Sequence, residues 1–366
     1  MPKRLILMLA LVFVLVFASS CGDNSNGQQA VVNTETPTPV ATPVIVTRTP
    51  AEPSETPVES ITPTPEPEPE PEEEFIFPDP NIRPVSVMID NQGDRVLPQG
   101  GIAQAQIVYE ILTEYNITRY MLFFWGTMPD MIGPVRSARH YFLDYAMEYD
   151  AVYTHFGWSE YAQRDIARLK INNINFDSGE AFWDITSDKN NWQDTYTSRE
   201  RIEKAIKKLK YATTPKKTFP FTYHSSFTVP ESGSEARDIF IKFSTSGVST
   251  CGYEYDEAKG LYARERMGKP HMERNTGKQV MVRNIIIAEI ASPLIAGDQY
   301  GRINLNNIGT GSGWYITGGK AVKIKWKKDS RDAQTSYLDE SGNPIVLNPG
   351  QTWIEIVPKL SLVEIK

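Results

Sequence analysis

Short apolar runs and helix-spaced apolar residues divide the first half of the folded chain into alternating strands and helices. The runs at 84–90, 105–112, 117–125 and 151–155 have the length and composition of strands buried in a sheet. Apolar residues at helical spacing predict helices at 134–148, 159–169 and 199–209, the second with Ser159 as its N-cap. Strands that alternate with helices predict an α/β domain.

The second half carries the pattern of β-hairpins. Alternating stretches at 239–244, 253–264, 311–327 and 337–346 contain turn residues, and apolar runs at 279–290 and 350–357 predict two further strands. This spacing fits a sandwich or a partly open barrel. We therefore predict an α+β fold, with an α/β domain at 81–212 followed by a β-rich domain at 213–366.

The N-terminus has the pattern of a processing signal at residues 1–20. Two basic residues precede an apolar stretch at 5–17, and Ala18-Ser19-Ser20 stand directly before Cys21. Small residues before a cysteine resemble a bacterial lipobox, which implies cleavage before Cys21 and its acylation, with diacylglycerol and palmitate as the lipid groups. The alternative is an ordinary secretory signal in which Cys21 is incidental. A membrane-spanning helix is less favoured, because the apolar run is short.

Residues 21–80 form a low-complexity tether, rich in Pro, Thr and Glu. Extended at about 3 Å per residue, it has a reach on the order of 100 Å. It holds 12 of the 45 acidic residues and, with the leader, three of the 38 basic ones, which leaves 33 acidic and 35 basic residues in the folded part. The acidic balance therefore belongs to the tether, and no basic stripe predicts a nucleic-acid partner.

Only two cysteines occur, so lipidation of Cys21 leaves Cys251 without a disulfide partner. Cys251 lies among small residues, which favours a small core residue over a nucleophile.

The run Gly133–His140 concentrates charge in one short stretch. On the predicted helix, Arg136, Ser137 and Arg139 lie near the N-terminus, where backbone N–H groups and the helix dipole favour an anion. With Arg119 they predict an anion-binding pocket, because guanidinium groups bind carboxylate or phosphate through paired donors. The alternative is a buried ion-pair network.

Other residues support weaker chemical hypotheses. The candidate catalytic residues are His155, Asp90, Glu110 and Ser159. A zinc site would use His140 and His155 with Asp90, Glu110 or Asp144, but no tight ligand spacing supports it, and we expect no metal and no cofactor. Neither Ser137 nor Ser159 lies in a nucleophile elbow. Trp158, Phe176, Trp183 and Trp192 would stack on sugars or peptides if they are exposed, and form core if they are buried.

Several longer motifs resemble the YerB-type lipoproteins. They include Arg83-Pro84-Val85, Tyr109-Glu110, the run 133–139, Gly268-Lys269-Pro270-His271 and the stretch 348–353. The resemblance covers roughly residues 83–358. It implies a lipid-anchored surface protein of a Gram-positive-type bacterium whose two halves are domains of unknown function, and it transfers no catalytic residue.

These patterns together predict a lipid-anchored envelope protein on the extracytoplasmic face of the cell membrane. We expect Arg136 and Arg139 to bind an anionic cell-wall group, such as a peptidoglycan carboxylate or a wall-polymer phosphate. One alternative is a wall hydrolase or amidase that uses His155 with Asp90 or Glu110. The other is a scaffold that docks a protein partner, which the sequence does not identify.

Overall fold

The computed structural model describes residues 75–366, which form one compact unit. The predicted leader, Cys21 and nearly all of the tether lie outside the described residues. Between 75 and 366, no helix is both long and apolar enough to cross a membrane.

The first half contains short strands and three α-helices. Their bounds are β1 Val85–Asp90, β2 Ile107–Leu112, β3 Thr118–Phe124, α1 Phe142–Glu148, β4 Val152–Thr154, α2 Glu160–Leu169, β5 Asn173–Ile174, β6 Trp183–Asp184, β7 Thr195–Tyr196 and α3 Arg199–Leu209. The predicted helix at 199–209 matches α3, and Ser159 caps α2 by accepting a hydrogen bond from the Ala162 N–H at 3.2 Å.

The second half consists of strands and one 3₁₀ turn. The strands are β8 Thr222–Tyr223, β9 Ser234–Glu235, β10 Asp238–Lys242, β11 Thr250–Asp256, β12 Leu261–Arg266, β13 Lys269–Pro270, β14 Met281–Val282, β15 Asn284–Glu289, β16 Gly309–Thr317, β17 Lys320–Lys328, β18 Ser336–Leu338, β19 Val346–Leu347, β20 Thr352–Val357 and β21 Val363–Ile365. The predicted strand at 279–290 is divided into β14 and β15, and the sequence pattern did not predict β21.

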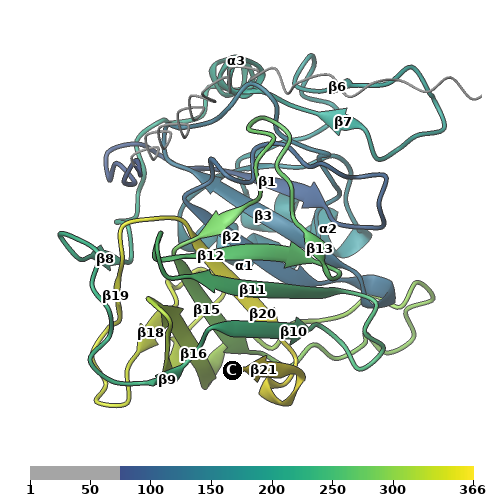
Figure 1. The fold of residues 1–366 in the computed structure, drawn as a ribbon. Coiled ribbons are helices and arrows are strands. Elements are labelled where there is room, and N and C mark those ends of the chain that lie inside the picture. The colour runs from purple at the N-terminus through teal and green to yellow at the C-terminus, as the bar shows by residue number, and fades with distance from the viewer. Residues whose placement is uncertain (1–74) are drawn as a thin grey trace, which may run out of the picture. The chain divides into compact units, whose positions relative to one another are not determined.

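One large mixed sheet joins the two halves (Figure 1). Its strand order is β18-β17-β16-β15-β20-β2-β3-β1-β4-β5, with β9 paired to β17. β20, near the C-terminus, pairs in parallel with both β2 and β15. The α+β class is confirmed. The domain boundary at residue 212 stays a prediction, and the large sheet contains strands that precede and strands that follow residue 212.

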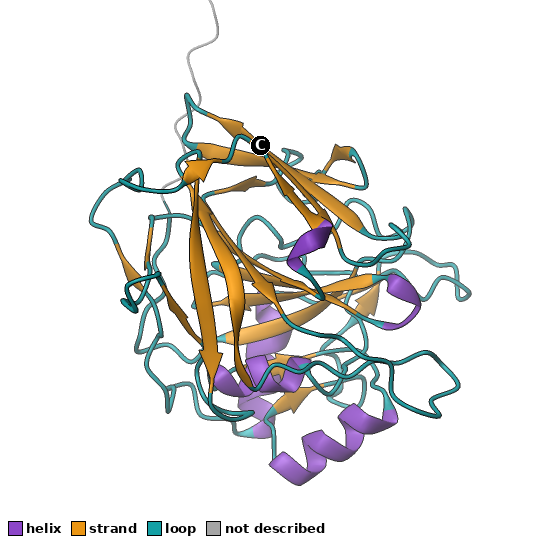
Figure 2. Cartoon of the chain, turned by 90° about the horizontal axis from the view of Figure 1, so that it is seen from below, coloured by secondary structure: helices purple, strands orange, loops and turns teal. Residues whose placement is uncertain are grey.

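The large sheet is covered on both faces. On one face, the Tyr109 ring of β2 packs 4.6 Å from that of Tyr145 on α1, and Figure 2 shows the helices gathered to one side of the strands. On the other face lies the six-stranded sheet of β10–β14 and β21, where the His271 ring packs 5.8 Å from Tyr120 of β3. Burial on both faces explains why β1, β2 and β3 are nearly all apolar.

The predicted helix at 134–148 is wrong over its first eight residues. Only Phe142–Glu148 is helical; residues 134–139 are not helical, and His140 and Tyr141 form a turn that leads into the helix. Its backbone N–H groups bind neighbouring segments: Val135 donates to the Thr195 carbonyl at 2.7 Å, and Arg136 donates to the Met88 carbonyl at 2.9 Å. These long-range hydrogen bonds replace the helical ones, so Arg136, Ser137 and Arg139 do not lie at a helix N-terminus.

Candidate functional site

Exposed aromatic side chains gather around Arg136. Phe176 and Trp192 keep 51% and 50% of their surface accessible, and Phe156 is also exposed. The Phe156 ring lies 6.2 Å from Phe176 and 5.4 Å from Phe182. We call this set the aromatic surface; it comprises Phe156, Trp158, Phe176, Phe182 and Trp192. The hypothesis of exposed aromatic residues therefore fits Phe176 and Trp192, whereas Trp158 and Trp183 are half-buried.

Arg136 lies between a buried carboxylate and an exposed indole. Its Nε is 3.2 Å from Oδ2 of Asp90, and its guanidinium carbon lies 4.1 Å from the centre of the Trp192 ring. In the described part of the chain, the two terminal nitrogens of Arg136 make no hydrogen bond or ion pair. Burial lowers the pKa of Arg136 and Asp90 opposes this shift, yet arginine stays charged at physiological pH. One edge of the guanidinium is therefore available to an anion.

Asp90 is fixed by the backbone and by a second side chain. Its Oδ1 accepts the Gln92 N–H at 3.0 Å, and its Oδ2 accepts Nε2 of Gln193 at 3.3 Å. Asp90 is wholly buried, so its charge needs these partners and Arg136. It orients Arg136 through the contact with Nε.

Arg119 and Arg139 are held by a residue that the sequence analysis did not select. Glu114 accepts Nε of Arg139 at 2.8 Å, pairs with Nη2 of the same arginine, and lies 3.3 Å from Nη2 of Arg119. Burial alone would raise the pKa of Glu114, but the hydrogen bond from Arg139 and the charge of Arg119 lower it to about 2. These two arginines form the buried ion-pair network that was the alternative to an anion pocket.

The candidate catalytic residues do not come together. In the strand register, Asp90 of β1 lies opposite Arg119 of β3, and Glu110 of β2 lies opposite Tyr120 of β3. Since adjacent residues of a strand point to opposite faces, Asp90 and Glu110 lie on opposite faces of the large sheet.

His155 is buried beside its own loop. Its Nδ1 lies 2.7 Å from the Gly157 carbonyl and its Nε2 lies 3.1 Å from the Asn173 side-chain oxygen, while burial lowers its pKa. Ser159 is occupied as the cap of α2, and the Ser137 carbonyl accepts Nη1 of Arg119 at 2.6 Å. The geometry gives His155 a structural role, with no carboxylate or serine among these hydrogen-bond partners.

The candidate zinc ligands also have other partners. His140 bonds the Asn304 side chain at 2.9 Å, and Asp144 pairs with Arg331 at 2.7 Å. Within residues 75–366, the one group of three potential ligands consists of Glu110, Cys251 and Glu355.

That group is buried between the two sheets, and the guanidinium of Arg264 lies beside its two carboxyl groups. Arg264 is fully buried, pairs with Glu110, and lies 4.0 Å from Glu355. Its guanidinium carbon lies 4.0 Å from the Trp353 ring, and its Nη1 lies 2.7 Å from Nδ1 of His271. Arg264 thus supplies the positive charge that Glu110 needs, which makes the group an ion-pair network rather than a metal site.

Glu355 is a buried carboxyl of this network whose pKa is raised. Burial and the nearby charge of Glu110 raise its pKa to about 8, against the opposing charge of Arg264. Cys251 is buried, as predicted for a small core residue, and its Sγ lies 3.9 Å from Glu355. The sequence analysis did not select Arg264 or Glu355; the available signal was a glutamate, Glu110, inside an apolar strand.

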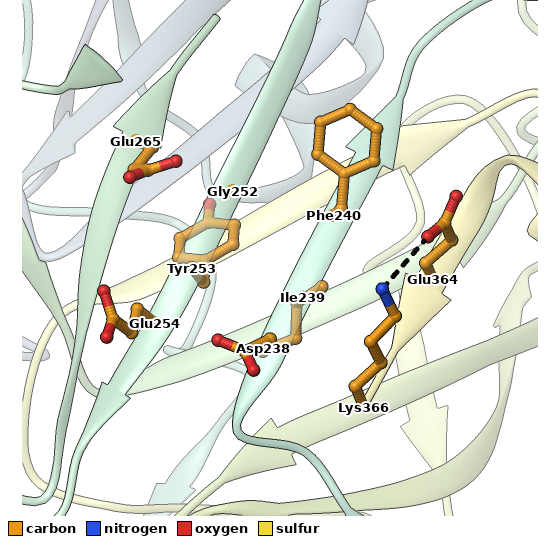
Figure 3. A pocket seen from close by; sticks show the side chains of 9 residues that line it. All are labelled: Asp238, Ile239, Phe240, Gly252, Tyr253, Glu254, Glu265, Glu364 and Lys366. Atoms are coloured by element: carbon orange, nitrogen blue, oxygen red, sulfur yellow. Dashed lines mark ion pairs between the residues drawn. The ribbon is translucent and has the colours of Figure 1, made fainter. Parts of the chain in front are cut away.

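Two surface hollows differ in charge. One, of about 180 Å³, lies on β10, β11, β12 and β21 and is shown in Figure 3. Its charged side chains are Asp238, Glu254, Glu265, Glu364 and Lys366. Lys366 pairs with Glu364 at 3.7 Å, so the hollow has an acidic balance and does not suit an anion. The other, of about 280 Å³, lies between α3 and the loop 178–181 and is lined by three basic residues.

Comparison with known proteins gives one consistent result. Residues 74–212 match the family model described as "Protein of unknown function (DUF3048) N-terminal domain", and residues 239–354 match its C-terminal counterpart. The chain is 33% identical over 289 residues to "Putative lipoprotein YerB" of Bacillus subtilis (strain 168), which covers 77% of this chain and 83% of the relative. It is also similar to the crystal structure of the YerB protein from Bacillus subtilis, with a TM-score of 0.69 and 30% identity over 78% of this chain and 94% of that one.

The conserved fold and the matches over both halves agree with the resemblance that the sequence motifs carried. The chain therefore belongs to the YerB-type family, whose two consecutive domains have no assigned function.

Proposed function

We propose that this protein is anchored through Cys21 on the extracytoplasmic face of the cell membrane and binds an anionic group of the cell wall through Arg136. The observation that carries the proposal is the position of Arg136, whose Nε faces Asp90 while its terminal nitrogens make no hydrogen bond or ion pair with the described chain. The family's lipoprotein member supports the anchored state.

The surroundings of Arg136 favour binding over a purely structural role. The side chain is 22% exposed, so it is recessed but open to solvent. An ion pair formed in such a partly dehydrated position is stronger than one on an open surface. The two terminal nitrogens can donate in parallel to a carboxylate or a phosphate, and Trp192 covers the flat face of the guanidinium.

The aromatic surface supplies contacts for the uncharged part of the ligand. Phe156 donates its backbone N–H to the Arg136 carbonyl at 3.1 Å, so the two residues are neighbours through their backbones. Exposed aromatic rings stack on the apolar faces of sugars and on peptide side chains. A ligand that combines an anion with a sugar or peptide unit fits both features.

The test is retention of the full chain, purified in detergent, on purified bacterial cell walls. Trp192→Ala is expected to weaken binding about fivefold by removing the stacked ring, with no change in melting temperature because Trp192 is half-exposed. Arg136→Gln is expected to weaken binding at least about tenfold, with a small loss of stability because Asp90 loses a cation.

Arg164→Gln is the matched control. Arg164 is exposed on α2 and also lies over an aromatic ring, 5.6 Å from the centre of Tyr161, but it is not part of the aromatic surface. Its replacement should leave retention unchanged. The proposal is wrong if Trp192→Ala and Arg136→Gln are retained as tightly as the wild-type chain.

A further inference from the structure

The basic hollow beside α3 is the second feature of the surface that suits an anion. It is lined by the loop 178–181 and by Arg201, Lys204, Ala205 and Lys208 of α3, with a volume of about 280 Å³. Three cations and the single carboxylate of Glu180 give it a net charge of about +2. Exposed lysines at this spacing occupy one side of the helix.

The charge of the hollow is only partly used by the protein itself. Lys204 pairs with Glu180 at 2.9 Å, but both side chains are more than two-thirds exposed, and such pairs contribute little. The ammonium of Lys208 makes no hydrogen bond or ion pair with the described residues. Arg201 donates to the carbonyls of Glu180 and Phe182 and lies over the Trp183 ring at 4.8 Å.

The backbone of the loop allows Lys208 to approach. Gly179 has φ +87°, a conformation that favours glycine, and a Cβ at this position would lie 2.9 Å from Nζ of Lys208. Any larger residue would both strain the loop and displace the ammonium. The glycine therefore leaves room for the Lys208 ammonium at the wall of the hollow.

Arg201 connects the hollow to a residue of the aromatic surface, Phe182. Nη1 of Arg201 lies 3.5 Å from the Phe182 carbonyl, and the Phe182 ring packs 5.4 Å from Phe156. Phe156 in turn donates its backbone N–H to the carbonyl of Arg136. A series of contacts thus links the hollow to the backbone of Phe182, the Phe182 ring to the Phe156 ring, and the backbone of Phe156 to that of Arg136.

We infer that the ligand is a repeating phosphodiester polymer, which places one phosphate on Arg136 and another in the hollow of Arg201, Lys204 and Lys208. The inference rests on the proposed function, because it assumes that Arg136 binds an anion. Two separated cation sites joined by aromatic rings match a polymer in which phosphates alternate with polyol or sugar units. Lysine ammonium groups are compact charges that can donate hydrogen bonds to a phosphate from many directions. Planar carboxylates favour the paired donors of arginine.

The shape of the surface favours a polymer over an anionic membrane. Arg136 is recessed to 22% exposure and the lysines line a hollow, so a flat layer of headgroups would not reach both sites. A flexible chain with discrete charges can enter each of them.

The test compares a synthetic glycerol-phosphate hexamer with the glycerol-phosphate monomer, using the full chain in detergent and calorimetric titration. The hexamer is expected to bind at least about tenfold more tightly, because its second phosphate binds at high effective concentration. Lys204→Ala with Lys208→Ala should remove that advantage. Arg136→Gln should weaken both ligands.

Lys323→Ala with Lys325→Ala is the matched control, since it removes two exposed lysines from β17. It should leave the affinity for the hexamer unchanged. If the hexamer binds no more tightly than the monomer, the inference fails while the proposed function stands; if neither ligand binds and walls do not retain the chain, both fail. One further outcome would overturn the inference in favour of a membrane surface. The chain would bind phosphatidylglycerol vesicles but not the hexamer, and the variant that lacks Lys204 and Lys208 would lose binding to the vesicles.

Discussion

Replacement of Glu355 by glutamine tests whether this buried carboxyl is protonated in the folded protein. The side chain lies on β20 with no exposed surface, and Tyr253 and Cys251 donate to its Oε1. Its Oε2 has no hydrogen-bond partner in the described chain. Burial and Glu110 raise the pKa of Glu355 to about 8, so the neutral acid is the form that the fold accommodates.

The magnitude follows from the difference between the folded and unfolded pKa values. The pKa rises from 4.5 to about 8 on folding, so the folded chain holds a proton that the unfolded chain releases, and stability falls as the pH rises from about 4.5 to about 8. At about 1.4 kcal/mol for each pKa unit, the full loss is about 5 kcal/mol, of which about 4 kcal/mol falls between pH 5 and pH 9. Glu355→Gln is neutral at every pH and should not show this loss.

Urea unfolding followed by tryptophan fluorescence at pH 5, 7 and 9 measures this effect. The variant should match or fall slightly below the wild-type chain at pH 5 and exceed it by several kcal/mol at pH 9. The comparison between the two chains cancels contributions that they share, including that of His271, whose pKa is lowered by burial and by Arg264. Unfolding free energies that differ by a constant amount from pH 5 to pH 9 would refute the reasoning.

Three further predictions concern stability and reactivity. Glu114→Gln should destabilise the fold by about 3–5 kcal/mol, because it leaves the buried Arg119 and Arg139 unpaired. Because the pKa of Glu114 is lowered to about 2, the wild-type chain should lose stability as the pH falls from 4.5 towards 2, and the Glu114→Gln variant should not. Replacement of the exposed Glu180 by glutamine is the control. Equal loss of stability in acid for the wild-type chain and Glu114→Gln would contradict the assignment. Cys251 should react with a thiol reagent only after global unfolding, since burial raises its thiol pKa; rapid labelling of the folded chain would show that its site opens. Gly313→Ala should lower the free energy of unfolding by about 1–3 kcal/mol, and with it the urea midpoint, because its Cβ would lie 2.3 Å from the Ile287 carbonyl oxygen. An unchanged midpoint would mean that β15 and β16 can separate without cost.

The elements whose signals are local could be predicted from the sequence. The helix at 199–209 has helical apolar spacing and Ser198 as a side-chain cap, and its bounds agree with α3. The strands β1, β2 and β3 are runs of apolar residues because both faces of the sheet are covered. The hairpin of β16 and β17 turns at Gly318-Gly319, where both residues have positive φ.

The elements that depend on distant partners could not be predicted. Val135 and Phe142 follow a helical spacing, but the N–H groups of the 133–141 segment bind strands and loops elsewhere in the chain. The partner of Glu110 is Arg264, 154 residues away, and nothing in the local pattern of either residue indicates the other. The sequence identified Arg136 as a candidate. It could not show that Arg136 pairs with Asp90 while Arg119 and Arg139 pair with Glu114, because these partners are also distant in the chain or in the sheet.

The position of β20 has a consequence for the order in which the chain can fold. A polypeptide is synthesised from its N-terminus, so β2 is complete more than 200 residues before Thr352–Val357, the strand that pairs with it. Until then one edge of β2 has no partner, and open strand edges promote association with other chains. The first half of the chain therefore passes through an interval in which this edge of β2 is open to association with other chains.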